Sequence, residues 1–334
     1  YRLVWIPSLG GVPAGRGGFP FKRTWQAGIL LASLFFFSSC SRPHQSLRIF
    51  HAAGLAPVLE AARPWMESDL GIELLAEGSG SQAACRKLTE LGRPCDLLML
   101  SDAPLVGELC RDSCDWRIDF ATDDVVLGVG SRAPWIPDAE VNWIEVLLNP
   151  DVRLARVDEN LAPIGYRTML VLKLTEQTRP MPGLLTNFLA RCKVVVDDVS
   201  RLPPLLKSGE IDYAFLYRSI AWANEVRHIP LDPRVNLGSP RDDYSVAEVT
   251  FQALTAGTRR QVTVRGAYVV WTLSIPSGAD FKAAKRFVTG FLNRPEDPLS
   301  PHGLKPLRPP RFYGPKPVWE EHFDWTQYAG ELTP

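Results

Sequence analysis

A strand, a polar turn and a helix follow one another three times between residues 47 and 110. This succession constrains the fold more than any other feature of the chain. The apolar segments 47–50, 72–75 and 96–100 are each followed by a Gly, Ser or Pro turn and then by an amphipathic stretch. Repeated units of this kind build a mainly parallel sheet covered by helices. The first part of the chain therefore predicts an α/β fold.

A second series of strands and helices begins after Asp124. The expected elements are strand 125–129, helix 143–148, strand 152–157, helix 165–175, strand 193–196, helix 202–207, strand 213–217, strand 267–275 and helix 281–292. At about 150 residues per domain, a length of 334 residues fits two domains. Two α/β series in one chain therefore suggest two lobes. The proline-rich segment 306–317 is interpreted as a spacer or a strap across one lobe.

The N-terminal segment has the layout of a secretory signal. Lys22 and Arg23 precede the uncharged apolar run 27–37, which ends in Ser-Ser-Cys40. A membrane-spanning helix needs about 20 apolar residues, so this run is too short. The alternative is a buried helix, but the run has no amphipathic period. We expect residues 1–39 to be removed as a signal segment.

The residues Phe-Ser-Ser-Cys at 37–40 resemble the lipobox of bacterial lipoproteins, with Phe in place of the usual Leu. The resemblance implies that Cys40 becomes the lipidated first residue of the mature protein. We therefore expect a protein of the periplasm or cell surface that is attached to the membrane through a lipid anchor only.

Charge and cysteine content exclude several classes of protein. Lys and Arg number 37 against 37 Asp and Glu, with a pI near 7.1, so the basic face of a nucleic-acid binder is not expected. Apart from Cys40, the chain has five cysteines, which can form at most two disulfides and leave one free thiol. They are Cys85, Cys95, Cys110, Cys114 and Cys192. The sequence does not determine which of them pair. The pair 110 and 114 lacks the second half of a zinc site, and we expect no metal site.

Three turns are candidates for a ligand site. In open α/β sheets, ligands bind beyond the carboxyl ends of the strands. The turns 53–54, 78–81 and 162–165 each precede an expected helix. The first N–H groups of a helix and its partial positive charge hold an anion without Lys or Arg. Each turn alone is equally an ordinary helix cap. Three turns in the expected places favour an anion site.

Six segments carry a family likeness, and the most specific are Asn142–Arg153 and Gly165–Thr168. The others are 51–56, 77–81 together with 86–92, 120–127 and 208–215. In order, they resemble the tungstate/molybdate-binding proteins of the archaeal type, which are extracellular receptors of ABC importers. The likeness covers most of residues 47–310. It implies a two-lobed periplasmic-binding-protein fold of type II, in which each lobe is a mixed sheet flanked by helices.

The resemblance also implies where the lobes divide and which residues bind the ligand. One lobe is expected to hold residues 44–126 and 271–334, and the other residues 127–270, with the strands 125–129 and 267–275 as the hinge crossings. The residues implied to line the ligand site are Gly54, Ser79, Ser81, Ala162, Pro163, Gly165, Tyr166 and Leu216.

The sequence departs from the family at four positions. Gly54 stands where the family commonly has a Ser that contacts the oxyanion, and Asp123 stands at a family Asn. Ala162 and Leu216 replace the Asp and Glu that give the metal centre two extra carboxylate ligands. A tetrahedral anion held only by N–H groups and hydroxyls remains reasonable, and so does a ligand that is not an oxometallate. If an oxometallate binds, we expect weaker affinity and less preference between tungstate and molybdate.

The leading hypothesis is a monomeric solute-binding lipoprotein that needs no cofactor. It would deliver molybdate, tungstate or a related oxyanion to the permease of an ABC importer. The alternative is a sensor or binding protein of the same fold with a different or lost ligand. An enzyme is not expected, because the five histidines are scattered. The chain also contains no Gly-x-Ser-x-Gly, His-Glu-x-x-His or P-loop motif.

Overall fold

The structure is a computed structural model that describes residues 45–134, 142–179, 181–255 and 258–332. The predicted signal segment 1–39 and the predicted lipidation site Cys40 lie outside the described residues. Within them, no helix is both long enough and apolar enough to cross a membrane.

The first sheet, called sheet A here, has seven strands in the order β14-β13-β4-β12-β3-β1-β2. The strands are β1 (Gln45–Ala52), β2 (Ile72–Ser79), β3 (Leu97–Leu100), β4 (Arg117–Asp123), β12 (Val269–Ser274), β13 (Lys305–Tyr313) and β14 (Gln327–Gly330). β1 runs parallel to β2 and β3, whereas β12 runs antiparallel to both β3 and β4. Sheet A is therefore mixed, with its parallel part built by the three predicted strand-turn-helix units.

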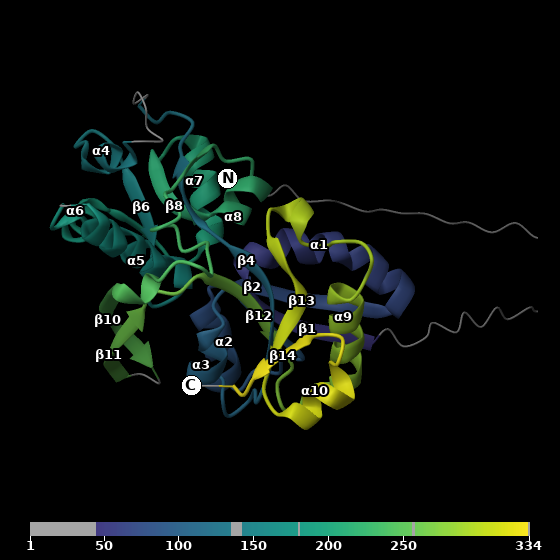
Figure 1. Ribbon diagram of the computed structural model, residues 1–334. Helices are drawn as coiled ribbons and strands as arrows, with labels where there is room; N and C mark the ends of the chain where they lie inside the picture. The colour runs from purple at the N-terminus through teal and green to yellow at the C-terminus, as the bar shows by residue number, and fades with distance from the viewer. Residues whose placement is uncertain (1–44, 135–141, 180, 256–257, 333–334) are drawn as a thin grey trace, which may run out of the picture. The chain divides into compact units, whose positions relative to one another are not determined.

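Helices cover both faces of the parallel part of sheet A (Figure 1). They are α1 (Ala56–Trp65), α2 (Ser81–Thr89), α3 (Pro104–Leu109) and α9 (Phe281–Leu292), whereas α10 (Lys316–His322) packs beside β14. Because side chains alternate along a strand, Leu97 and Met99 join the core that contains α1 and α9. Leu98 and Leu100 pack in a separate cluster with α2 and α3. Burial on both faces explains the continuous apolar run of β3.

The second sheet, called sheet B here, has five strands in the order β7-β6-β8-β5-β9. They are β5 (Val125–Val129), β6 (Leu154–Val157), β7 (Val194–Val196), β8 (Tyr213–Tyr217) and β9 (His228–Pro230). The associated helices are α4 (Trp143–Leu148), α5 (Pro163–Thr178), α6 (Leu184–Arg191), α7 (Leu202–Ser208) and α8 (Arg218–Ala223). A separate antiparallel hairpin is formed by β10 (Glu248–Thr255) and β11 (Thr258–Arg265). Short helical turns are η1 (Ala53–Leu55), η2 (Met66–Leu70), η3 (Val199–Arg201), η4 (Tyr244–Val246) and η5 (Ser300–His302).

The chain passes between the sheets at two places. β4 of sheet A ends at Asp123 and β5 of sheet B begins at Val125. The chain is back in sheet A at Val269, where β12 begins. The expected crossing strands therefore each lie within one sheet, and short segments before them make the crossings. The lobe boundaries expected after residues 126 and 270 fall inside β5 and β12, and the exact limits of the lobes stay a prediction.

The proline-rich segment is not a spacer. Residues 305–313 form β13, which pairs antiparallel with β4 and parallel with β14. The pairing with β4 shifts register between Pro306 and Arg311. Proline has no N–H to donate, so a strand with several prolines is expected to pair with such an irregularity. The interpretation as a strap was therefore wrong.

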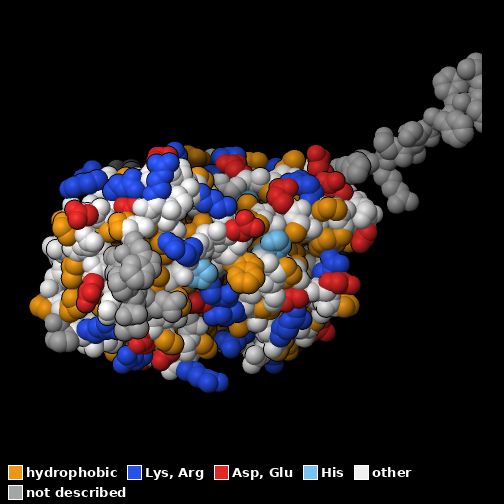
Figure 2. All heavy atoms as spheres, turned by 90° about the horizontal axis from the view of Figure 1, so that it is seen from above, with side chains coloured by type: hydrophobic (Ala, Val, Ile, Leu, Met, Phe, Trp, Pro, Cys, Tyr) orange, Lys and Arg blue, Asp and Glu red, His pale blue; other side chains and the backbone are white. Residues whose placement is uncertain are grey.

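The surface carries both signs of charge. On the face shown in Figure 2, Lys and Arg side chains are interspersed with Asp and Glu. The five cysteines that the structure describes are all buried and none forms a disulfide. Among the described residues, no group of three or more His, Cys, Asp or Glu side chains is arranged to hold a metal ion.

Candidate ligand-binding site

A small pocket, called the central cavity here, lies where the turn after β1 meets the starts of α2 and α5. It is lined by Ala52, Ala53, Gly54, Ser79, Gly80, Ser81, Ser101, Ala162, Pro163, Ile164, Asp198, Val199, Tyr217 and Trp271. Five of the eight predicted ligand residues are among them. The volume is about 10 Å³, which is the space of roughly one water molecule.

The starts of two helices border the central cavity. α2 begins at Ser81 and α5 begins at Pro163, and both helices have more than eight residues. The two starts are in close contact, because a Cβ atom on Gly80 would lie only 2.0 Å from the carbonyl oxygen of Leu161. Only glycine permits this approach. The glycine of the second predicted turn therefore brings the two helix starts together.

Gly54 is enclosed by two large side chains. A Cβ atom at this position would lie 2.5 Å from Cδ1 of Ile220 and 2.8 Å from Cη2 of Trp271. The side chain of Ile220 and the indole of Trp271 therefore together occupy the space in which a serine side chain at position 54 would stand. This contact gives a physical reason for the departure from the family pattern at Gly54.

Two buried donors at the central cavity have no hydrogen-bond partner of good geometry. They are the hydroxyl of Tyr217 and Nε1 of Trp271, on side chains only 2% and 1% exposed. Burial raises the pKa of Tyr217 and the neighbouring Ser101 side chain acts in the opposite direction, so the Tyr217 hydroxyl keeps its proton. An unpaired buried polar group costs about 1–3 kcal/mol. Two such donors at one cavity are the strongest sign of a missing acceptor.

The serine hydroxyls are held in place by neighbours. The backbone N–H of Ser101 donates to Oγ of Ser81 at 3.0 Å, and the two hydroxyls lie 3.1 Å apart. Nζ of Lys87 donates to Oγ of Ser79 at 3.0 Å. The Ser81 hydroxyl accepts from a backbone group, so its own hydrogen is available to Ser101 or to a ligand.

A carboxylate also reaches the central cavity. One oxygen of Asp198 accepts from the backbone N–H of Ser200 at 2.8 Å and caps η3, whereas Oδ2 is buried without a partner. From the sequence, only hydrogen-bond donors were expected to line the ligand site, and Asp198 was missed. The sequence signal was weak, because an Asp two residues before a Ser is an ordinary helix cap.

Three predicted residues lie elsewhere. Leu216 pairs with Val126 in sheet B. Its Cδ1 lies beside Gly128, on the face of the sheet that also contacts Leu206 of α7. Successive residues of a strand point to opposite faces, so Tyr217 and not Leu216 faces the cavity. Gly165 is packed against the backbone of Glu159, where a Cβ atom would lie 2.6 Å from its N and Cα.

Tyr166 is the third predicted residue that does not line the central cavity. It forms a buried cluster with Arg167 and Asp102. The Tyr166 hydroxyl donates to Oδ2 of Asp102, and the Arg167 guanidinium donates to Oδ1 of the same carboxylate at 2.5 Å. Arg167 and Asp102 are 2% and 6% exposed. Asp102 follows β3 of sheet A, and both other residues belong to α5. The motif therefore anchors α5 against sheet A.

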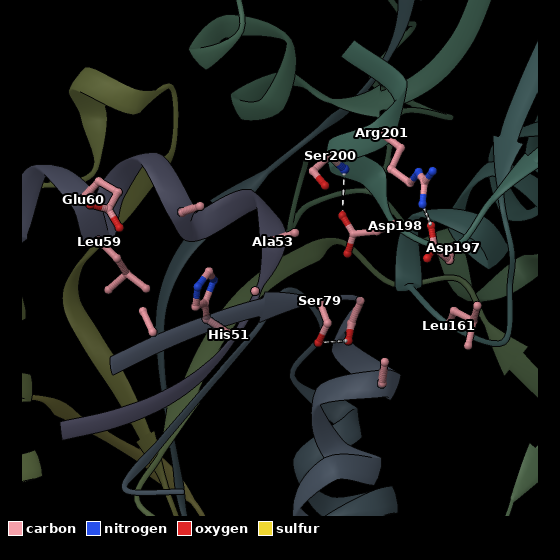
Figure 3. Close-up of a pocket in the computed structure, with 15 residues that line it drawn as sticks. His51, Ala53, Leu59, Glu60, Ser79, Leu161, Asp197, Asp198, Ser200 and Arg201 are labelled. Atoms are coloured by element: carbon pink, nitrogen blue, oxygen red, sulfur yellow. Dashed lines mark hydrogen bonds and ion pairs between the residues drawn. The ribbon is translucent and has the colours of Figure 1, made fainter. Parts of the chain in front are cut away.

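A larger opening, called the outer pocket here, adjoins the central cavity and has a volume of about 710 Å³. It shares Ala53, Ser79, Gly80 and Asp198 with the central cavity. In Figure 3 the Asp198 side chain points toward Ser79, and His51 lies on the opposite side. Burial lowers the pKa of His51, so this imidazole is neutral at pH 7. The outer pocket and the central cavity therefore share part of one wall.

Asp123, at the position of a family Asn, does not line the central cavity. Its side chain is fully buried and accepts hydrogen bonds from the hydroxyl and N–H of Ser219 and from the N–H of Asp124. Burial raises the pKa of Asp123 to about 6. The negative charge that Asp123 carries in place of the family Asn therefore lies at the passage from β4 to β5.

Two mixed sheets with flanking helices, and a donor-lined cavity where helix starts from both meet, define a two-lobed binding protein. The fold is the type II arrangement of periplasmic binding proteins. The chain belongs to the family of bacterial extracellular solute-binding proteins, whose sequence profile matches residues 47–295. The family consists of solute-binding proteins and not of enzymes.

Relatives and solved structures agree with this assignment. The chain is 30% identical to a solute-binding protein of Petrotoga mobilis, over 69% of this chain and 74% of the relative. It is 29% identical to the molybdate/tungstate-binding protein WtpA of Pyrococcus abyssi, over 61% and 69% of the two chains.

Two solved structures share the fold. The periplasmic molybdate-binding protein of Azotobacter vinelandii matches with a TM-score of 0.55 at 18% identity, over 77% of this chain and 98% of that one. The sulfate-binding protein SubI of Mycobacterium tuberculosis matches with a TM-score of 0.57 at 15% identity, over 87% and 94%.

Proposed function

We propose that this chain binds a tetrahedral oxyanion in the central cavity, with tungstate and molybdate as the first candidates, and delivers it to an ABC importer. The observation that carries the proposal is the pair of buried, unpartnered donors, the Tyr217 hydroxyl and the Trp271 indole N–H. Both lie at a cavity that the starts of α2 and α5 also border.

The donor set suits an anion without any cationic side chain. No Lys or Arg is among the residues lining the central cavity. Helix starts and neutral N–H and O–H donors stabilise negative charge at short range. The cavity must widen before an oxyanion enters, because it has space for about one water molecule only. A hinge motion of the two lobes, with little change inside each lobe, would supply that space.

The relatives support the choice of ligand. WtpA of Pyrococcus abyssi is a molybdate/tungstate-binding protein, and it is similar to this chain over most of its length. Ala162 lines the central cavity but has no carboxylate, and Leu216 points away from it. We therefore expect tungstate and molybdate to bind with lower affinity and less mutual preference than in relatives that keep both carboxylates.

The second candidate is a sensor or binding protein of the same fold with a different or lost ligand. The contact of Trp271 with Gly54 favours it, because the indole fills space that the family leaves to a ligand-contacting serine. In this reading the small cavity holds no oxyanion.

Calorimetric titration of the full chain with tungstate, molybdate, sulfate and phosphate at neutral pH tests both candidates. We expect one molecule of tungstate or molybdate to bind per chain. Tyr217→Phe should weaken binding about tenfold, which is the loss of about 1.4 kcal/mol from one hydrogen bond to a charged acceptor. Tyr213→Phe is the matched control, since Tyr213 lies in the same strand and its hydroxyl donates to the Pro134 carbonyl. Absence of binding by all four anions would support the second candidate.

We further propose that the mature protein is a monomer that begins at a lipidated Cys40 and lies in the periplasm or at the cell surface. The apolar run followed by Ser-Ser-Cys supports this. The intact mass of the membrane-extracted protein should correspond to an acylated chain without residues 1–39.

A further inference from the structure

A second pocket, called the hairpin pocket here, is lined by residues of both α2 and α5. It has a volume of about 420 Å³ and is bordered by α2, α3, α5 and the β10–β11 hairpin (Figure 1). It shares no lining residue with the central cavity or the outer pocket. Small-molecule sites typically have volumes of about 300–1,000 Å³, so the size suits a small organic molecule.

Three residues of the hairpin pocket carry buried side-chain atoms without a hydrogen-bond partner. These atoms are Oε1 of Gln82, Oδ1 of Asn160 and Nε of Arg167. Gln82 and Arg167 are only 5% and 2% exposed. Of the eight such atoms among the described residues, three belong to the hairpin pocket and three to the central cavity. The hairpin pocket therefore has as many unsatisfied polar atoms as the proposed oxyanion site.

The remaining polar atoms of these residues are committed to protein partners. Nε2 of Gln82 donates to the carbonyl of Glu159 at 2.9 Å, and Nδ2 of Asn160 donates to Asp158 at 3.0 Å. These bonds fix the orientation of both amides, so each presents a carbonyl oxygen as a free acceptor. Arg167 donates from its two terminal nitrogens to Asp102 and to the Ala267 carbonyl, which leaves Nε–H as a free donor.

The rest of the wall is mostly apolar. It includes Leu105, Leu170, Phe251, Val262 and Val264. The Phe251 ring is stacked on Tyr166 with ring centroids 5.9 Å apart, which holds the hairpin side chain in place. An occupant therefore needs an apolar body as well as a polar end.

The two unpaired acceptors, on Gln82 and Asn160, and the unpaired donor, on Arg167, determine which polar group of an occupant fits the hairpin pocket. An ammonium group offers donors but has no acceptor for Arg167, and a carboxylate offers no donor and brings negative charge close to Asp102 and Glu108. A primary carboxamide offers two N–H donors and one carbonyl acceptor and is neutral. Two further arginines of the wall lie near acidic side chains. Nε of Arg86 is 4.0 Å from a carboxylate oxygen of Glu90, and Nε of Arg265 is 3.8 Å from one of Glu248.

We propose that the hairpin pocket is a second binding site, which takes a neutral organic molecule with a primary carboxamide end and an apolar body. The free acceptors of Gln82 and Asn160 would receive its two N–H groups, and Nε–H of Arg167 would donate to its carbonyl. Gln82 belongs to α2 beside sheet A and Arg167 to α5 beside sheet B. A bound amide would therefore contact one helix beside sheet A and one helix beside sheet B.

Titration of the full chain with 3-phenylpropanamide, followed by calorimetry or ligand-observed NMR, tests the proposal. The comparison ligands are 4-phenylbutan-2-one, which replaces the NH2 group by a methyl, and 3-phenylpropanoate, which replaces it by a charged oxygen. We expect the amide to bind at least tenfold more tightly than either. Equal or weaker binding of the amide would overturn the assignment of the polar end.

Two variants of one strand locate the binding. Val262→Phe places a larger ring into the hairpin pocket, whereas Gln261→Phe adds the same ring at an exposed neighbour that does not line it. The first should reduce amide affinity at least tenfold and the second should leave it unchanged, with equal thermal unfolding of both variants as the check of folding. Tyr217→Phe should not alter amide binding. Amide binding that survives Val262→Phe, or that is lost with Tyr217→Phe, would contradict the proposed site.

Discussion

At the scale of single residues, the chemistry of the central cavity depends on side chains that face it from different elements. Tyr217 ends β8, Trp271 lies in β12, and Asp198 precedes η3. The two aromatic residues contact each other with ring centroids 5.6 Å apart, so their polar atoms are held rigidly. Two donors favour an anion, and the free oxygen of Asp198 opposes one.

The variant Asp198→Asn should strengthen oxyanion binding at least about tenfold. The change removes a negative charge from the cavity wall, and at an effective dielectric of about 20 two unit charges 4 Å apart repel by about 4 kcal/mol. Asn retains the oxygen that caps η3, so folding should be unaffected. Calorimetric titration with tungstate measures the change. Asp197→Asn, which removes the exposed carboxylate next to it, is the control, and unchanged or weaker binding by Asp198→Asn would refute the prediction.

The variant Asp123→Asn should change how stability depends on pH. The pKa of Asp123 rises from an ordinary 3.8 to about 6 on folding, so the folded state binds more protons between these values. Wild-type stability therefore falls as pH rises from about 4 to about 6, by up to about 3 kcal/mol at 1.36 kcal/mol per pKa unit.

Asn at position 123 has no such titration and keeps an acceptor for the Asp124 and Ser219 N–H groups. Relative to wild type, the variant should therefore gain stability between pH 4 and pH 7.5. Urea unfolding at both pH values measures the difference, with the exposed Asp151→Asn as control. Parallel pH profiles for wild type and Asp123→Asn would show that the burial of Asp123 has no such cost.

Part of the site could be predicted from residues alone. Ser79, Ser81 and Pro163 belong to local turn and helix-start patterns, and these patterns fix which backbone groups are unpaired. The roles of Tyr217 and Trp271 could not be predicted in this way. They depend on which face of a strand points to the cavity and on how two sheets pack, and neither is a local property of the sequence. The family position at Leu216 directed attention to the wrong face of β8.

At the scale of elements, η1, α8 and β12 meet at Gly54. The prediction here is that Gly54→Ser destabilises the protein by about 1–3 kcal/mol, because the new Cβ atom would approach Ile220 and Trp271 within 3.0 Å. Trp271→Leu should relieve part of that cost, because it removes the 2.8 Å approach and leaves the 2.5 Å approach of Ile220. A double-mutant cycle from urea unfolding measures the coupling. Strictly additive effects of the two substitutions would mean that the indole does not determine the residue at position 54.

The elements that sequence patterns predicted are those with strong periodicity. The helix at 281–292 matches α9, and the predicted apolar segments match β5, β6, β7 and β8 of sheet B, whereas β9 was not predicted. The β10–β11 hairpin was not expected, because β11 begins with polar residues, 258–261, that are exposed on both faces and give no apolar alternation. β13 was missed because its prolines are typical of irregular segments, whereas pairing with β4 and β14 outweighs that local preference.

At the scale of the whole described chain, two buried carboxylates, Asp102 and Asp124, accept hydrogen bonds from residues that are distant in the sequence. Asp102 receives Tyr166 and Arg167 of α5, and Asp124 receives Arg218 at 3.0 Å and Lys305 at 2.5 Å. The second carboxylate lies at the first passage between the sheets. A binding protein of this kind needs such fixed points near the crossings, so that ligand entry moves the lobes without disrupting either core.

The central claim is that an oxyanion occupies the cavity between Ser81, Tyr217 and Trp271. The most direct measurement is the NMR signal of the Trp271 indole N–H in protein labelled with ¹⁵N-tryptophan and titrated with tungstate, with Trp271→Phe used to assign the signal. We expect this signal to shift more than those of the other indoles and to saturate at one tungstate per chain. Tungstate binding by calorimetry with no change in the Trp271 signal would contradict it.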